Sequence, residues 1–224
     1  MKKSIVLLIS LFFISALSIL IFKNLEDTNF FIKEKNDKLK KIQLITSIKN
    51  TQVEISKLFL ENTKNIDNIV AKLDSQFIPI NIKDISVLFM LKEYDRVNIN
   101  LLSQSDSKKY KEVNELFLDN SISDFDSFKY MFKTLEKEYK ITSSENKNFV
   151  NNNKQIDDII IKFMKETYSN KVLNIKNKLG FIDKNENENL YELFIKVNYL
   201  DDFAKAYYIL NKKGVVKYFE SSFK

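Results

Sequence analysis

The sequence predicts an α+β protein: an N-terminal transmembrane helix that continues into a long helix, and an antiparallel β-sheet with an inserted, mostly α-helical domain. Three observations predict this class. The chain opens with an apolar run, a helical pattern without glycine or proline follows, and strand-like stretches flank a helical region. The expected parts are a cytoplasmic leader (1–4), the transmembrane helix (5–22), a helix with the first strands (23–106), the helical insertion (107–189) and a C-terminal β-hairpin region (190–224).

The apolar run predicts a membrane anchor. Residues 5–22 contain no charged side chain, and at about 1.5 Å per residue they form a helix of roughly 27 Å, close to the hydrocarbon thickness of a bilayer. Lys2 and Lys3 precede the run, whereas Lys23 is soon followed by two acidic residues. Because positive charge favours the cytoplasmic side, we expect a single-pass membrane protein with its N-terminus in the cytoplasm and everything after Lys23 outside.

Two kinds of cleavage are alternatives to an intact anchor. Ala16, Leu17 and Ser18 have the small-x-small form of a secretory signal, and a cut there would leave a chain beginning at Ile19. Against this, the apolar run continues past that point and polar helical sequence follows directly. A third possibility is a cut on the cytoplasmic side, directly after Ser4.

Composition excludes most enzyme classes. Without histidine or cysteine there is no Ser-His triad, thiol nucleophile or ordinary zinc site. Two glycines leave no phosphate-cradling loop, and no spacing singles out a Ser-Lys dyad or a carboxylate pair. The net charge of +6 comes from lysines interleaved with acids, which is typical of a solvated surface. We therefore expect no catalysis and no direct contact with nucleic acid.

Residues 24 to about 60 predict one long helix, with residues 50–51 as the expected place for an interruption. A second helical pattern overlaps its end and runs to Asp74. The same pattern fits a helix packed on a globular sheet and a coiled stalk. The apolar positions recur mostly every three or four residues: Leu25, Phe30, Phe31, Ile32, Leu39, Ile42, Ile45, Ile48 and Ile55.

Strand-like sequence begins near Pro79, the only proline. We predict a β-hairpin between residues 85–91 and 97–101, because both are rich in strand-forming residues and a polar turn separates them. At the C-terminus, residues 190–199, 203–210 and 215–223 read as strands. Gly214 precedes the last of them and supplies a positive φ without strain, which predicts a terminal hairpin.

Between these strands the pattern is helical. The expected segments are residues 108–118, 126–140, 148–164 and 166–178. Ser123 or Asp124 is the expected cap of the second segment and Ser144 of the third. The aromatic residues are expected in the core: Phe117, Phe125, Phe128, Tyr130, Phe132, Tyr139, Phe163 and Tyr168.

Three features resemble the K-type minor pseudopilins of type II secretion systems, which are type IV prepilin-like proteins. Two lysines and Ser4 lead directly into the apolar run, with serine where that family normally has glycine. Ile9 occupies the fifth position after the expected cut, where the K type has an apolar residue and most pseudopilins have glutamate. The stretch 97–102, Val-Asn-Ile-Asn-Leu-Leu, is similar to the strand before the family's helical insertion, and a closing antiparallel pair follows.

The resemblance implies cleavage between Ser4 and Ile5 by the prepilin peptidase, and assembly through the helix around Ile9. It implies a single-pass protein of the bacterial inner membrane with a periplasmic C-terminal domain. Its implied role is structural, at the tip of a short pseudopilus, with other minor pseudopilins and the inner-membrane secretion platform as partners. A related DNA-uptake machine uses the same kind of subunit. The alternative is a membrane-tethered periplasmic adaptor or ligand-binding module built as a helical bundle, which requires residues 192–223 to be helical.

One acidic stretch has oxygen ligands at alternate positions, as the first half of a calcium loop does. Glu188 stands where such a loop has its turn glycine, and Phe194 where it has its bidentate glutamate. A solvated loop is the other interpretation. K-type pseudopilins bind calcium in their helical domain, so the candidate ligands are Asp183, Asn185, Asn187 and Glu188.

Overall fold

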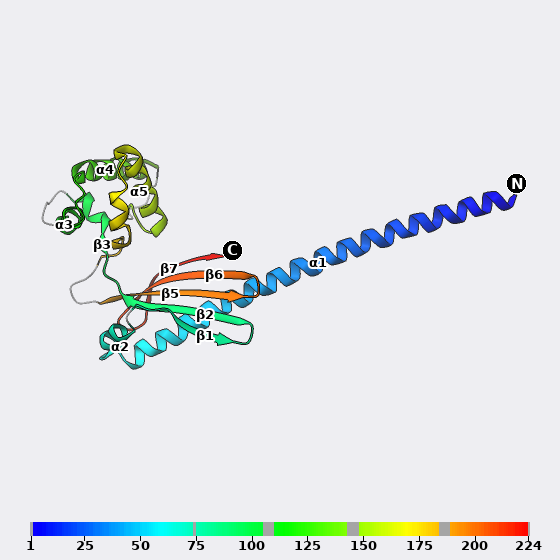
Figure 1. Cartoon of the computed structure of the whole chain (residues 1–224), viewed down its shortest axis with the longest axis horizontal. Helices are drawn as coiled ribbons and strands as arrows, with labels where there is room; N and C mark the ends of the chain where they lie inside the picture. Colours follow the sequence, from blue (N-terminus) through cyan, green and yellow to red (C-terminus); the bar gives the residue numbers. More distant parts are fainter. Residues whose placement is uncertain (1, 74, 105–109, 143–147, 184–188, 224) are drawn as a thin grey trace. The chain divides into compact units, whose positions relative to one another are not determined.

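The computed structural model describes residues 2–73, 75–104, 110–142, 148–183 and 189–223. For residues 2–12 and 140–142 it describes the backbone alone. The chain forms two compact units, Met1–Lys92 with Glu192–Lys224, and Glu93–Tyr191. Figure 1 labels the elements of both.

The first unit joins a long helix to a five-stranded antiparallel sheet, which confirms the predicted α+β class and antiparallel sheet. The strand order is β1-β2-β5-β6-β7. The elements are α1 (Lys2–Glu61), α2 (Ile66–Lys72), β1 (Ile78–Ile82), β2 (Ile85–Glu93), β5 (Leu190–Tyr199), β6 (Asp202–Asn211) and β7 (Val216–Phe223).

Helix α1 runs without a break through the position where an interruption was expected. The Thr51 hydroxyl donates to the Ser47 carbonyl one turn back (2.8 Å), so this polar residue is accommodated inside the helix. The chain turns only after Glu61. The second helical pattern is therefore divided between the end of α1 and the separate helix α2.

The C-terminal half of α1 packs on the sheet through one stripe of side chains. Leu44, Ile48, Ile55 and Phe59 are buried, and their spacings of four and seven residues place them on one face. Helix α1 contacts β6. Apolar burial along this stripe is what fixes the helix against the sheet.

The turn between β6 and β7 lies close against α1. Gly214 has φ +74°, and the Ser56 hydroxyl donates to its carbonyl (2.8 Å). A Cβ at this position would lie 2.6 Å from the Ser56 carbonyl oxygen, so the approach requires glycine. The predicted terminal hairpin is confirmed, with β6 and β7 antiparallel.

The predicted hairpin between residues 85–91 and 97–101 is wrong. Strand β2 pairs instead with β1, antiparallel from Ile78 opposite Phe89 to Ile82 opposite Ile85. Residues 97–98 form β3, which pairs in parallel with β4 about eighty residues later. The local pattern showed strand-forming residues correctly, but not the partner, because pairing is decided by tertiary contacts.

The second unit is mostly helical. Helices α3 and α4 lie where helices were predicted. The third segment begins later, because Asn152 caps α5 by accepting from the Gln155 amide (2.9 Å); the expected cap Ser144 lies outside the described residues. The elements are β3 (Val97–Asn98), the 3-10 helix η1 (Ile99–Ser103), α3 (Lys111–Asp119), α4 (Phe125–Thr142), α5 (Asn153–Thr167), the 3-10 helix η2 (Lys171–Lys178) and β4 (Leu179–Gly180).

An aromatic cluster fills the core of this unit. The rings of Phe117 and Phe128 lie 4.9 Å apart, and Phe163 meets Phe128 edge to face at 5.1 Å. Two aromatic residues expected in the core are instead on the surface, since Tyr130 is 77% and Tyr168 95% exposed. Tyr130 lies on an exposed face of α4, and Tyr168 follows the last residue of α5 with a positive φ of 52°.

Candidate assembly surface

The N-terminal half of α1 exposes its apolar side chains. Between Phe13 and Phe22 the large apolar residues are 58–70% exposed. At about 100° per residue their positions are spread around the whole helix, unlike the single buried stripe of its C-terminal half. In Figure 1 this half extends beyond the sheet. The exposed residues are Phe13, Ile14, Leu17, Ile19, Leu20, Ile21 and Phe22.

The residues predicted for processing and assembly lie at the start of this helix. Ser4, Ile5 and Ile9 belong to α1, but their side chains lie outside what the structure describes. Over the described residues, α1 and the other helices include none with both the length and the apolar character needed to cross a bilayer. Processing and anchoring therefore stay predictions.

The calcium prediction falls mainly outside the described residues. Asn185, Asn187 and Glu188 are not described, whereas Asp183 is, and its carboxylate accepts a hydrogen bond from the Asn98 amide. Among the described residues there is no group of three acidic side chains placed to hold a metal ion. Calcium binding at Asp183 and its neighbours stays a prediction.

The two asparagines of the Val-Asn-Ile-Asn stretch are buried and hydrogen-bonded within the second unit. Asn100 accepts from the Val150 amide (2.9 Å) and donates to the Val150 carbonyl (2.8 Å), so its side chain pairs with that backbone as a strand would. Asn98 accepts from the Asn100 amide (2.9 Å). The motif therefore ties the start of this unit to distant loops. In the sequence, the sign of this role was that Asn98 and Asn100 alternate with apolar residues.

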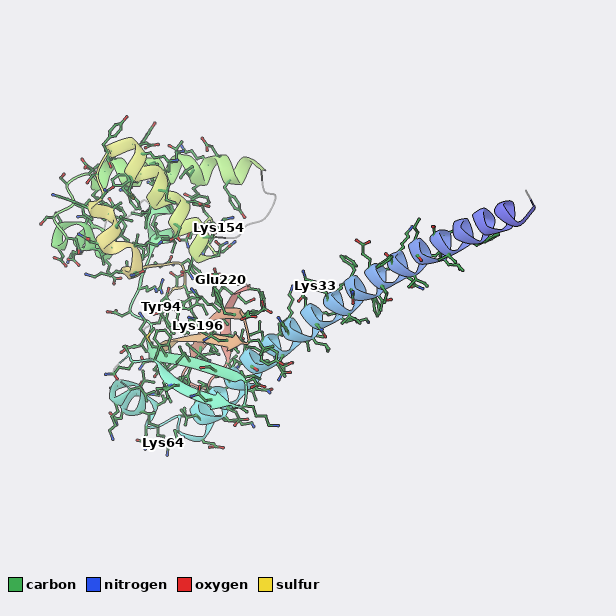
Figure 2. All side chains as sticks on the ribbon, turned by 45° about the vertical axis from the view of Figure 1, so that its right-hand side comes forward. Lys33, Lys64, Tyr94, Lys154, Lys196 and Glu220 are labelled. Carbon is green, nitrogen blue, oxygen red and sulfur yellow. The ribbon has the colours of Figure 1, made fainter. Side chains whose placement is uncertain are left out.

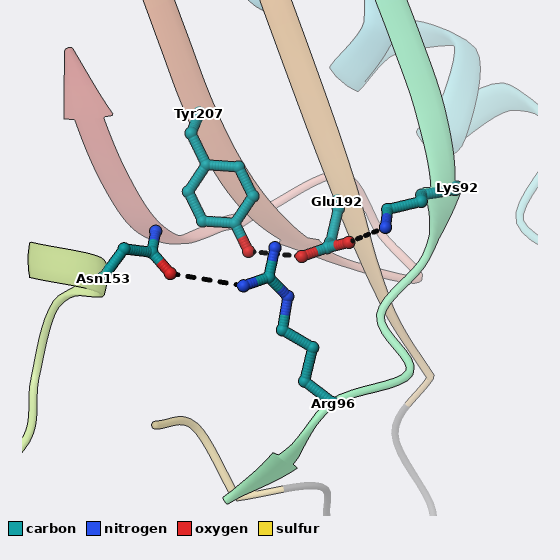
Figure 3. Close-up of polar contacts among 5 residues, drawn as sticks. All are labelled: Lys92, Arg96, Asn153, Glu192 and Tyr207. Atoms are coloured by element: carbon teal, nitrogen blue, oxygen red, sulfur yellow. Dashed lines mark hydrogen bonds and ion pairs between the residues drawn. The ribbon is translucent and has the colours of Figure 1, made fainter. Parts of the chain in front are cut away.

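A buried carboxylate in the first unit was missed by the sequence reasoning (Figure 3). Glu192 has no exposed surface, accepts from the Tyr207 hydroxyl (2.6 Å) and forms an ion pair with Lys92 (2.8 Å). A buried carboxylate is costly unless it is paired in this way. Lys92, Glu192 and Tyr207 belong to β2, β5 and β6, so these contacts link three strands of the sheet. The sequence did carry a sign of this contact, because Glu192 is an acidic residue among the apolar residues of a predicted strand.

Arg96 and Asn153 form a separate polar contact within the second unit, where the guanidinium donates to the amide oxygen at 3.3 Å (Figure 3). Gly180 lies beside the same segment, and a Cβ there would approach the Arg96 Cβ to 2.8 Å. These contacts place Arg96, directly before β3, beside the first residue of α5 and the end of β4. They contain no nucleophile and base in hydrogen-bond contact, and we interpret them as structural.

The sheet side that meets α1 carries one titrating group with a shifted pKa. Burial raises the pKa of Tyr208 to about 12, because removal from water disfavours the charged phenolate. Its ring stacks on Phe219 of the neighbouring strand, with centroids 4.7 Å apart. Tyr208 is therefore a packing residue, neutral at physiological pH.

No protein-family model, no curated protein and no solved structure matches this chain.

Proposed function

We propose that this chain is a structural subunit anchored in the bacterial inner membrane, resembling a K-type minor pseudopilin at the tip of a type II secretion pseudopilus. The division of α1 is the observation that carries the proposal. One continuous helix exposes apolar side chains from Phe13 to Phe22 and buries Leu44 to Phe59 against a sheet. Such a helix can hold a folded domain on one end while its other end packs in lipid or among other helices.

The order of the elements also supports this proposal. A helical region lies between β2 and β5, and an antiparallel pair, β6 with β7, closes the chain. Both features are expected from the resemblance. The alternative of a helical-bundle adaptor requires helices over residues 192–223, and these residues form strands. A tethered adaptor with an α+β domain is the second candidate.

In the proposed arrangement residues 1–4 are cytoplasmic, residues 5–22 cross the membrane, and the rest of the first unit together with the second unit lies in the periplasm. Ile9 takes the place of the usual glutamate, so this subunit cannot neutralise the terminal amine of the subunit before it. Its partners are other minor pseudopilins and the secretion platform. Its role is assembly without catalysis. The lysine-rich surface is compatible with both protein secretion and DNA uptake.

Intact mass and N-terminal sequencing of the membrane-extracted protein test this proposal. The comparison is between cells with and without their prepilin peptidase. We expect a chain beginning at Ile5 only when the peptidase is present, and a Ser4→Gly variant, which restores the residue usual in the family, to be processed at least as completely.

A chain beginning at Met1 in both cells would remove the pseudopilin proposal and favour the tethered adaptor. A chain beginning at Ile19 would show secretion of a soluble protein and would remove both. An Ile9→Glu variant that is processed normally serves as a control, because it alters the proposed assembly position and not the cut.

A further inference from the structure

Helix α1 carries a second apolar stripe outside the proposed membrane segment. Leu25, Ile32 and Leu39 are separated by seven residues each, and they are 54%, 51% and 62% exposed. Seven residues are close to two turns, so these side chains follow one line along the helix with a drift of about 20° per step. This set, Leu25, Ile32 and Leu39, is named the outer stripe.

The outer stripe points away from the sheet. Leu39 and the buried Leu44 are five residues apart, which rotates their directions by about 140° at 3.6 residues per turn. The sheet-facing side chains from Leu44 to Phe59 keep the direction of Leu44. The folded unit therefore uses one side of α1 and leaves the outer stripe for another molecule.

The charged residues that flank the outer stripe are mostly lysines, with Glu26 beside Leu25 as the acidic exception, whereas the opposite side carries mostly acids together with Lys41. Lys33 and Lys35 lie about 100° and 60° from Ile32 and so flank the stripe. Glu34 lies about 160° from Ile32, and Asp37 the same from Leu39, on the opposite side. The Lys35 amine lies over the Phe31 ring, 5.2 Å from its centroid, which keeps that charge beside the stripe.

We propose that the outer stripe binds a helix of another subunit that has apolar residues every seventh position and acidic residues beside them. Apolar seams with opposite flanking charges are how paired helices select their partners. A second copy of this chain is disfavoured, because a parallel pair would bring Lys33 and Lys35 of each helix together. The parallel direction rests on the proposed function, in which both helices start in the same membrane.

Site-specific cross-linking tests this surface in cells. The chain has no cysteine, so Ile32→Cys introduces a single thiol on the stripe and Glu34→Cys a matched thiol on the opposite side. Each thiol is labelled with a maleimide-benzophenone, irradiated, and its adducts are identified by mass spectrometry. We expect an adduct from position 32 to an acidic, heptad-patterned segment of another protein, and none to that segment from position 34.

Charge reversal separates recognition from proximity. We expect K33E/K35E in the Ile32→Cys background to lower the yield of that adduct by about tenfold, because like charges would then face each other. Replacing the acids of the cross-linked segment by lysine is expected to restore it. The matched control K64E/K154E changes the same charge at two exposed lysines outside α1 (Figure 2), and it is expected to leave the yield unchanged.

Four outcomes would overturn the inference: adducts with phospholipid alone, adducts with a second copy of this chain, equal adducts from both positions, or no adduct. Fractionation of the same cells keeps the proposed function separate. A membrane-embedded chain that begins at Ile5 and gives any of these four outcomes removes the outer-stripe inference and leaves the proposed function standing. A chain found outside the membrane removes the proposed function, whatever the adducts.

Discussion

The two halves of α1 are equally continuous as helix and opposite in what they do with their apolar residues. From Phe13 to Phe22 these residues are spread around the helix and are exposed on all sides. From Leu44 to Phe59 they are spaced by four and seven residues and are buried against the sheet. Spacing decides the difference, because only a periodic stripe can be covered by one neighbouring surface. Only the C-terminal half of α1 therefore contributes buried apolar side chains to the first unit. The apolar side chains of the N-terminal half remain exposed for contact with lipid or with another protein.

The largest expected effect is the difference in stability between two variants, each of which loses one phenylalanine from one half of α1. Phe59→Ala removes a fully buried ring and is expected to destabilise the sheet by about 3–5 kcal/mol. Phe22→Ala removes a ring that is 70% exposed and is expected to leave sheet stability unchanged. Hydrogen exchange of β6 in the full detergent-solubilised chain measures both. Equal protection in the two variants would contradict the comparison.

A smaller effect is expected where the β6–β7 turn meets α1. Gly214→Ala places a Cβ against Ser56 at a residue with φ +74°, which we expect to cost about 1–3 kcal/mol. Lys213→Ala, in the same turn, is the control. The same exchange experiment on β7 distinguishes them, and full protection in Gly214→Ala would show that this turn can move away from the helix.

Loss of one hydroxyl group sharpens the comparison further. Ser56→Ala removes the bond that the hydroxyl donates to the Gly214 carbonyl and the bond that it accepts from the Gln52 amide, and is expected to cost about 1–2 kcal/mol. Ser47→Ala removes a hydroxyl bonded within its own helix, to the Gln43 carbonyl, and is expected to cost less. A denaturant titration monitored by circular dichroism compares the free energies of unfolding of the two variants. A larger decrease in Ser47→Ala would contradict the importance of the contact between α1 and the β6–β7 turn.

One effect is absent at neutral pH and appears only in alkali. The pKa of Tyr208 is about 12 in the folded protein and 10 in the unfolded chain, so the folded state retains the proton more strongly. Its contribution to stability is complete below pH 10 and is lost as the pH rises from 10 towards 12. We expect a falling denaturation midpoint over this range, and a weaker fall in Tyr208→Phe. Identical pH profiles would contradict the assignment.

Local patterns were sufficient to predict the long helix, the three C-terminal strands and most helices of the second unit, because each rests on periodicity within one segment. They failed where distant segments decide the outcome. Val97 and Asn98 pair with Leu179 and Gly180, and no property of residues 85–101 contains that information.

The polar contacts were harder to predict than the strands. Asn100 could be recognised as a polar residue in an apolar stretch, but its bonds to Val150 depend on a loop fifty residues away. Glu192 likewise finds Tyr207 and Lys92 only after β2, β5 and β6 have assembled. The candidate assembly helix could be predicted from the sequence because its apolar composition is enough to identify it. The outer stripe could be identified only from the exposed fraction of each side chain in the structure.

The ion pair between Lys92 and Glu192 has a consequence for how the protein is divided. It joins the last residue before the second unit to the first residue after it, with the amine and carboxylate 2.8 Å apart on strands adjacent in the sheet. The sheet therefore does not need the intervening ninety-nine residues, 93–191, for its connectivity. We expect that a short turn in their place would keep the strand order β1-β2-β5-β6-β7, because a shorter loop costs less entropy to close.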